Sequence, residues 1–460
     1  MWVQKSYTHR IVTIEHGSFF ARETVRFCVA RCRTPSGTLV TRRSEILPRW
    51  VKPGCVNGYD IEVHVGIQRF VRHRQREEIR EELKSRYGFF PSTGEVSILE
   101  ARFLEHLEAL HLHRAPAFRE ALARDGGYPL HIDATGEDGR GTLFVTYAGW
   151  RGWVLGSRKL STERADQILP HLRAVLVFGV PRAVLRDLGK AVIQAAQDFV
   201  AELGCDIPII SCHQHFLADV GEDLLEASHD AMRNLFRRFR LRPKLRTLAR
   251  DLGRRLGPEL SSLRNDVMTW AEGSTEHQLP EGLPGLAAVR SLAQWVLDYD
   301  NDGDHLGFPF DQPYLDFYER CRTARRATDA FLRRPLHDQT VQRHLKRLAR
   351  ILDRVITEPA FSQVAKTLSF RANLFDELRT ALRLSPKSSQ NRSGQNAVLP
   401  QRAAAELRDI RKAITALTRS LRRRRPQRGP ALDSRKAIDL ILTHLKKHGS
   451  SLWGHVISDN

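Results

Sequence analysis

Two aspartates have the residue type and local sequence of metal ligands. Asp133 lies in an alternating apolar stretch, LHIDATGE, and Asp187 ends another, AVLRDLGK. A single aspartate at a strand end more often shapes a turn. Two carboxylates at neighbouring strand ends can instead hold hard divalent cations such as Mg²⁺ through their oxygens. Such ions activate an attacking oxygen and stabilise a leaving one in phosphoryl transfer.

The elements expected around these aspartates follow a definite order. Three strands come first, at YPLHIDATG, GTLFVTYAGW and GWVLGSRKL, and then a helix, STERADQILPHLRAVL, with Ser161 as a candidate N-cap. A strand at PRAVLRD, a helix at GKAVIQAAQDFVAEL, a strand within CDIPIISCHQHF and a further helix complete the series. RNase H-like domains have this order, although many α/β proteins share parts of it. We therefore predict an α/β fold with an RNase H-like mixed sheet, in which the strands of Asp133 and Asp187 are neighbours.

Cysteines supply a second kind of candidate ligand. Cys28, Cys32 and Cys55 could hold zinc, with His9, His16 or His64 as the fourth ligand, because the spacing of the first two suits a metal site. The alternative is that they are buried free thiols, which pack like small apolar side chains. Cys212 and His215 follow the last expected strand and form a weaker metal signal.

The segment from residue 67 to residue 125 reads as helix, turn, helix. Gly88 and Pro91 interrupt the pattern, and Ser92 with Glu95 predicts a capping box at the start of the second helix. In a helix-turn-helix the second helix enters the major groove of DNA, and three hydroxyl side chains lie near its start: Ser92, Thr93 and Ser97. The alternative is an ordinary helical hairpin.

The charge of the chain indicates a polyanionic partner. The 460 residues carry a net charge of +20, with a pI near 10.2. The most concentrated basic run consists of Arg422, Arg423, Arg424 and Arg425, which we expect to contact DNA phosphates. No run of 18 or more apolar residues is present, and the first residues lack an apolar signal core. Six cysteines are too few for a disulfide scaffold and favour a reducing compartment.

The pattern changes divide the chain into six zones. They are a β-rich N-terminal module (1–66), with alternation in THRIVTIEHG and GYDIEVHVG, the helix-turn-helix region (67–125), the RNase H-like core (126–239), a large all-α insertion (240–384), a polar linker (385–400) and a basic helical C-terminal segment (401–460).

Three blocks, HIDATGE, VLRDLGKAV and CHQHFLADVGEDLLEASHDAMR, resemble successive blocks of bacterial insertion-sequence transposases of the DDE (RNase H-like) type. The resemblance continues through most of the chain, to LWGHVI. It implies Mg²⁺- or Mn²⁺-dependent cleavage and strand transfer, with Asp133 and Asp187 as the first two catalytic acids. The Cys212-x-x-His215 element is similar to the C/DxxH element of Mutator- and hAT-type transposases. The implied partners are double-stranded DNA, as terminal repeats and target, and further copies of the chain on DNA. The implied location is the bacterial cytoplasm, at the nucleoid.

The third acid departs from that pattern. Similar proteins continue past the LWGH block into an Arg-Thr-Asn-Asn-x-x-Glu segment, which this sequence lacks, so we expect a C-terminal truncation. The nearest internal substitute is Glu377, for which the alternative is an exposed position on an amphipathic helix. Three functions follow: an active transposase, a catalytically incomplete DNA-binding protein derived from one, or an RNase H-like nuclease without strand joining.

Overall fold

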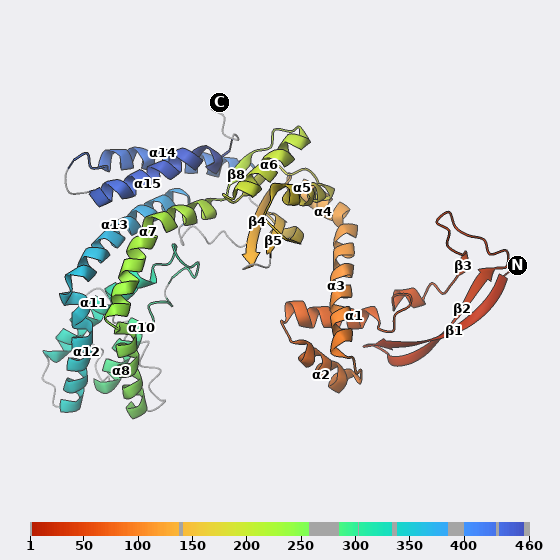
Figure 1. Ribbon diagram of the computed structural model, residues 1–460, viewed down its shortest axis with the longest axis horizontal. Helices are drawn as coiled ribbons and strands as arrows, with labels where there is room; N and C mark the ends of the chain where they lie inside the picture. The colour runs from red at the N-terminus through yellow and green to blue at the C-terminus, as the bar shows by residue number, and fades with distance from the viewer. Residues whose placement is uncertain are drawn as a thin grey trace. The chain divides into compact units, whose positions relative to one another are not determined.

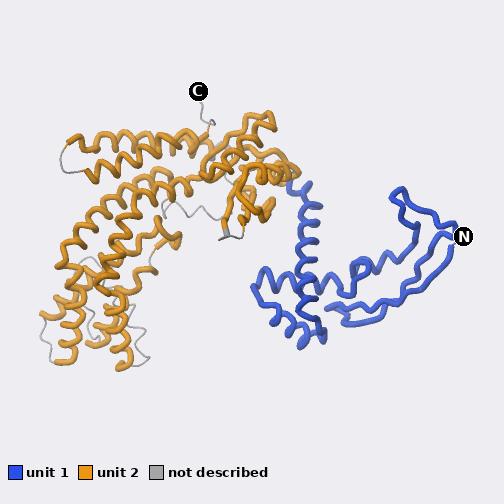
Figure 2. The backbone as a smooth tube through the Cα atoms, viewed as in Figure 1, with its two compact units in different colours: residues 1–120 blue, residues 121–460 orange. Residues whose placement is uncertain are grey.

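The chain divides into two units, residues 1–120 and residues 121–460 (Figure 2). The computed structural model describes residues 2–137, 141–256, 285–301, 303–333, 338–384, 400–428 and 432–454. No helix in these ranges is long and apolar enough to cross a membrane.

The first unit begins with a long β-hairpin (Figure 1). Strand β1 (Trp2–Thr13) pairs antiparallel with β2 (Gly17–Cys28), from Trp2 opposite Cys28 to Thr13 opposite Gly17. A short strand, β3 (Thr41–Arg42), adds to β2. The strands are mostly exposed, and β1 becomes buried only near the turn, at Ile11 and Val12.

Helices complete the first unit: α1 (Tyr59–Gly66), a π-helical turn (Ile67–Val71), α2 (Arg76–Tyr87) and α3 (Thr93–His113), followed across the unit boundary by α4 (Ala115–Arg124). Val12 of β1 packs with apolar side chains of α1, α2 and α3. The predicted modules 1–66 and 67–125 therefore share one core and are not separate.

The β-rich prediction for residues 1–66 is wrong at its C-terminal end, where YDIEVHVG forms α1. Ile61 and Val65 are buried, whereas Val63 between them is 48% exposed. An apolar residue at every second position suits a strand, but the first and third also stand four apart, which is the helical spacing. The contacts with α3 select the helix.

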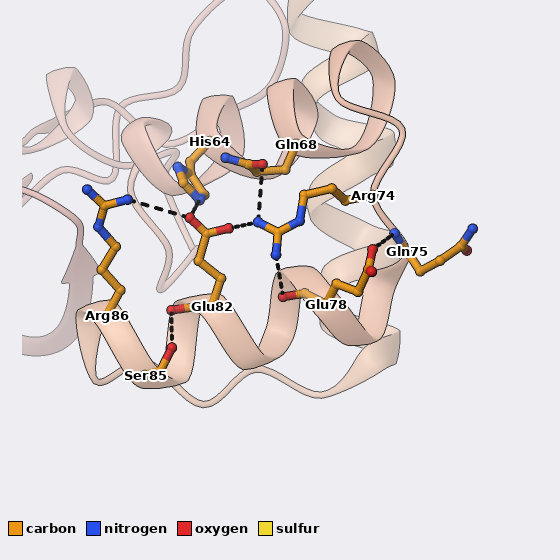
Figure 3. A network of polar contacts seen from close by, with 8 residues as sticks. All are labelled: His64, Gln68, Arg74, Gln75, Glu78, Glu82, Ser85 and Arg86. Atoms are coloured by element: carbon orange, nitrogen blue, oxygen red, sulfur yellow. Dashed lines mark hydrogen bonds and ion pairs between the residues drawn. The ribbon is translucent and has the colours of Figure 1, made fainter. Parts of the chain in front are cut away.

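A polar network joins α1, the π-helical turn and α2 (Figure 3). Arg74 donates to the side-chain amide oxygen of Gln68 and to one carboxylate oxygen of Glu82. The other carboxylate oxygen of Glu82 lies 3.7 Å from Nε2 of His64. Glu78 accepts a 2.8 Å hydrogen bond from the Gln75 amide at the start of α2. Gly88, at φ +63°, ends α2, and α3 begins after Ser92. The predicted helix, turn and helix are thus present.

The second unit contains a five-stranded mixed sheet in the order β6-β5-β4-β7-β8. Strands β4 (Pro129–Glu137), β5 (Gly141–Ala148) and β6 (Trp153–Leu160) are antiparallel, and β7 (Ala183–Arg186) and β8 (Ile209–Ser211) run parallel to β4. Helix α5 (Ala165–Ala174) and helix α6 (Lys190–Leu203) connect them. The sequence predicted each of these elements in order. Ser161 is not the N-cap, however, because α5 begins only after Arg164.

Long helices form the rest of the second unit. They are α7 (His213–Arg238), α8 (Leu241–Leu256), α10 (Gly285–Leu297), α11 (Pro313–Leu332), α12 (Gln339–Thr357), α13 (Pro359–Ala381), α14 (Pro400–Arg424) and α15 (Leu432–His448), with a 3-10 turn (Gly449–Leu452). The predicted insertion at 240–384 is thus helical. The predicted linker lies outside the described residues up to residue 399.

The predicted C-terminal segment, 401–460, is not separate from the earlier helices. Ile410 and Leu421 of α14 and Ile441 of α15 belong to the same buried cluster as α7 and α13. Arg383 pairs with Asp409, so ion pairs reinforce the apolar contact. The amphipathic faces of α14 and α15 therefore make one helical body with the insertion (Figure 1).

Candidate active site

Three adjacent strands present polar side chains at one level of the sheet. His131 of β4 is paired with Leu185 of β7, and continuing this register by two residues places Asp133 beside Asp187. Arg186 of β7 is paired with Ser211 of β8, so one more step places Asp187 beside Cys212. The expected neighbourhood of the two aspartates is therefore found. Asp133 is not at the end of β4 but lies just past the end of its pairing with β7.

Asp133 is accessible to solvent and faces a histidine. Its Oδ1 accepts a 2.9 Å hydrogen bond from the Ala134 amide and lies 3.8 Å from Nε2 of His215. Two residues earlier, burial lowers the pKa of His131 to about 4, and its Nδ1 lies 3.1 Å from the Tyr147 hydroxyl. A neutral, buried imidazole and an exposed carboxylate thus stand on the same face of β4.

Asp187 lies beside a carboxylate that the sequence analysis missed, Glu163. Gly189 reveals the arrangement: a Cβ added there would lie 3.0 Å from Oε1 of Glu163 and 3.2 Å from Oδ1 of Asp187. The Gly189 amide donates to Asp187 Oδ1 at 3.0 Å. Glu163 precedes α5, after the end of β6. Three acids therefore gather at this end of the sheet: Asp133, Asp187 and Glu163.

The electrostatics of this acid group leave room for a cation. Partial burial and the charge of Asp187 raise the pKa of Glu163 above its ordinary value. Among the described residues, no Lys or Arg side chain forms an ion pair with Glu163 or Asp187. Carboxylates that cluster without a Lys or Arg partner suit a divalent metal. The carboxylate oxygens of the three acids do not all lie within 4.8 Å of one another. Two metal ions about 3.5–4 Å apart would not require them to.

Cys212 and His215 occupy the first turn of α7, with Cys212 as its N-cap. The hydrogen bond that His215 donates to the Cys212 sulfur raises the pKa of His215 to about 9, and the charges of Cys212, Asp133 and Asp187 add to the effect. Burial acts to raise the pKa of the Cys212 thiol, but hydrogen bonds and the charge of His215 outweigh it and lower the pKa. At neutral pH His215 therefore carries a positive charge beside the acids.

Glu377 lies elsewhere. Both guanidinium nitrogens of Arg424 donate to its carboxylate, one at 2.9 Å, so Glu377 joins α13 to α14. Among the described residues, no hydrogen bond or ion pair connects it with Asp133 or Asp187. Glu377, the predicted substitute for the third acid, is thus not the acid beside Asp187, which is Glu163.

The three-cysteine zinc site is not supported. The thiols of Cys28 and Cys32 lie 3.1 Å apart, and Cys28 pairs with Trp2 at the start of β1. Cys55 lines a cavity with His9 and Ile11 of β1. These two residues lie seven or more positions after Trp2, a distance along the strand on the order of 20 Å. Only Cys28 and Cys32 converge.

The predicted DNA contacts are placed as follows. Ser92 caps α3 by accepting from the Glu95 amide, and Ser97 donates to the carbonyl of Thr93. Glu95 does not complete a capping box, because its carboxylate accepts from Asn57 instead. In the basic run, Arg422 and Arg423 are exposed, whereas Arg424 pairs with Glu377 and Arg425 with Asp439.

A scan against models of protein families, a search of curated proteins and a search of solved structures each found no match to this chain.

Proposed function

We propose that the chain is a DNA transposase of the DDE type that cleaves and transfers DNA strands with the acids Asp133, Asp187 and Glu163. The observation that carries the proposal is the convergence of these acids, together with His215, at one end of the mixed sheet. Three antiparallel strands followed by two parallel ones agree with the RNase H-like arrangement that the element order suggested.

The acids would hold Mg²⁺ or Mn²⁺, which stabilises charge on the phosphoryl group and lowers the pKa of an attacking water or 3′-hydroxyl. Asp133 lies on β4 and Asp187 directly follows the adjacent parallel strand β7, so the pairing of these strands brings the two acids to one end of the sheet. Glu163 lies on a connection instead. The imidazolium of His215 offers a charge-assisted hydrogen bond to a phosphate oxygen.

The rest of the chain supplies features suited to a double-stranded DNA partner. A net charge of +20 favours binding to phosphates, and the α2–α3 pair has the form of a helix-turn-helix. The exposed Arg422 and Arg423 add a sequence-independent contact. Assembly of several copies on DNA and a nucleoid location go with this proposal.

Glu163 also bears on the two other functions. A catalytically incomplete DNA-binding protein was suggested by the missing third acid, and the proximity of Glu163 to Asp187 favours the complete enzyme over it. A nuclease that cuts without joining needs an internal third acid, so Glu163 is compatible with it. Joining activity is therefore what separates the transposase from the nuclease.

The test uses the full chain, Mg²⁺ or Mn²⁺, and duplex DNA that carries the sequences flanking its gene. We expect nicks at 3′ ends and, when an intact target duplex is added, joined products, because the 3′-hydroxyl freed by cleavage attacks a target phosphodiester and releases the target's 3′-oxygen. Glu163→Gln should reduce the cutting rate by about a hundredfold or more, because a loosened ligand misplaces the reacting groups. Asp166→Asn, which removes an exposed charge three residues later, is the matched control and should cut normally.

The outcomes separate the candidates. Cutting without joining supports the nuclease, and binding without cutting supports the incomplete protein. If Glu163→Gln cuts at the parental rate and Glu377→Gln abolishes cutting, the assignment of the third acid is wrong.

A further inference from the structure

A second cluster of ligand side chains lies between helices α7 and α15. Asp219 and Asp223 stand four residues apart on α7, and His444 and His448 stand four residues apart on α15, so each pair lies on one face of its helix. The ligand atoms of Asp219, His444 and His448 all lie within 4.8 Å of one another. Within the described part of the chain, no other group of three has this property.

The hydrogen bonding of His444 leaves one nitrogen directed at a carboxylate. Its Nε2 lies 2.9 Å from Oδ2 of Asp223, a separation at which Nε2–H donates to the carboxylate. Its Nδ1 lies 3.5 Å from Oδ2 of Asp219 and is buried without a hydrogen-bond partner. A metal-binding histidine typically has this arrangement, with the outer nitrogen donating to a carboxylate that fixes the tautomer.

His448 contributes a second unpaired nitrogen. Its Nε2 is buried and has no hydrogen-bond partner among the described residues. A buried polar atom without a partner is costly, and a bound ion would remove this cost.

We propose that Asp219, His444 and His448 bind one divalent transition-metal ion, best matched by Zn²⁺, with Asp223 orienting His444. Two imidazoles and one carboxylate are the donors that Zn²⁺ favours, whereas Mg²⁺ and Ca²⁺ favour oxygen ligands throughout. A tetrahedral ion with bonds of about 2.0–2.2 Å holds its ligand atoms about 3.3–3.5 Å apart. The 3.5 Å separation of His444 Nδ1 and Asp219 Oδ2 agrees with this spacing.

An ion-free explanation accounts for only part of the cluster. A protonated His444 could pair with both aspartates, since Asp219 and Asp223 flank its two nitrogens. That arrangement leaves Nε2 of His448 buried without a partner. A metal ion satisfies both histidines at once, and the half-exposed side chain of Asp219 leaves the site open to solvent.

The bound ion would fasten α15 to α7 next to the candidate active site. His448 is the last residue of α15, and the turn that follows it reaches β8: the hydroxyls of Ser451 and Ser211 lie 2.7 Å apart, and Nε2 of His213 donates to the Leu452 carbonyl at 2.6 Å. The site would therefore be structural and independent of the proposed catalysis.

The test measures metal binding to the full chain after treatment with a chelator. Zn²⁺ is titrated calorimetrically and Co²⁺ by its visible spectrum, for the parent and for the double variant His444→Gln/His448→Gln. We expect the parent to bind one equivalent more than the double variant. Asp223→Asn should weaken that equivalent by about 10- to 100-fold. Asp230→Asn, elsewhere on α7, is the matched control and should bind as the parent does.

Two further measurements keep the test decisive. A thiolate-to-cobalt charge-transfer band would identify binding at cysteines, so the difference spectrum between parent and double variant should lack it. If the double variant fails to fold, Asp219→Asn replaces it, because this half-exposed position tolerates the change. Equal binding by parent and variants, or no binding to the parent, overturns the proposal.

Discussion

Docking of the C-terminal turn on β8 depends on one buried side chain, Leu452. Its exposed fraction is 0%, and it belongs to the core cluster that runs through α7 and α15. Truncation of a buried leucine to alanine costs about 2–5 kcal/mol, from lost burial and the remaining cavity. We therefore expect Leu452→Ala to weaken the docking of residues 449–454 by about 3 kcal/mol.

Hydrogen exchange reports this loss directly. If the docked turn protects β8, the amides of β8 exchange through local opening. Each change of 1.36 kcal/mol in the free energy of that opening changes the exchange rate about tenfold. Peptides covering residues 207–213 should then exchange about a hundredfold faster in Leu452→Ala. Peptides of α6 should be unchanged, because α6 packs mainly against α5 and β7 and not against the turn.

The control is Leu432→Ala, at the start of α15, the helix that precedes the turn, where the side chain is 62% exposed. It should alter exchange less than about twofold, because exposed substitutions rarely exceed 0.5 kcal/mol. Unchanged exchange of residues 207–213 in Leu452→Ala would refute the conclusion that the turn stabilises β8.

Three further predictions concern packing, pH and salt. Gly221→Ala should destabilise the second unit by about 1–3 kcal/mol in urea unfolding, because its Cβ would lie 2.5 Å from side-chain atoms of α13 and of the loop before α11. Gly94→Ala should not destabilise the protein, because its Cβ would meet only the Ser92 hydroxyl, in ordinary contact at 3.8 Å. Burial holds the pKa of His229 below its ordinary value, so the unfolded chain binds the proton first and the stability falls as the pH drops below about 6.5. In His229→Phe we expect Tm to fall less over this pH range than in the parent, and an equal fall in Tm would contradict this. Replacing both arginines at 422–423 with glutamine should reduce the slope of the logarithm of DNA affinity against the logarithm of salt concentration by about 1–2. Arg425→Gln, which breaks an ion pair, should affect the stability of the protein more than this slope.

The succession of strands and helices along the second unit was predictable because each element has an unambiguous local pattern. Strands β4 to β8 are short apolar runs that end near charged or glycine residues. The helices between them have buried residues at helical spacing, as in α6. The same rules failed at residues 59–66, where the apolar spacing fits both a strand and a helix and only packing decides.

Site residues were predictable only where neighbouring strands bring them together. Asp133 and Asp187 follow from strand order, whereas Glu163 lies on a connection whose path the sequence does not specify. Its only signal was an acid between a strand and a helix. Asp219 and His444 are brought together by helix packing, so their pairing has no local signal. Cys28, Cys32 and Cys55 show the converse, since suitable spacing does not make three residues converge.

The contact between Ser211 and Ser451 spans 240 residues, which has a consequence during synthesis on the ribosome. At about 5–20 residues per second, the nascent chain needs on the order of 10 s to 1 min to add that stretch. β8 is the last strand of its sheet, so until then its free edge has no turn docked against it. An open strand edge is a template for pairing with other chains. Slowing translation between codons 211 and 452 should therefore increase aggregation of the nascent protein, and a chaperone that covers strand edges should reduce it.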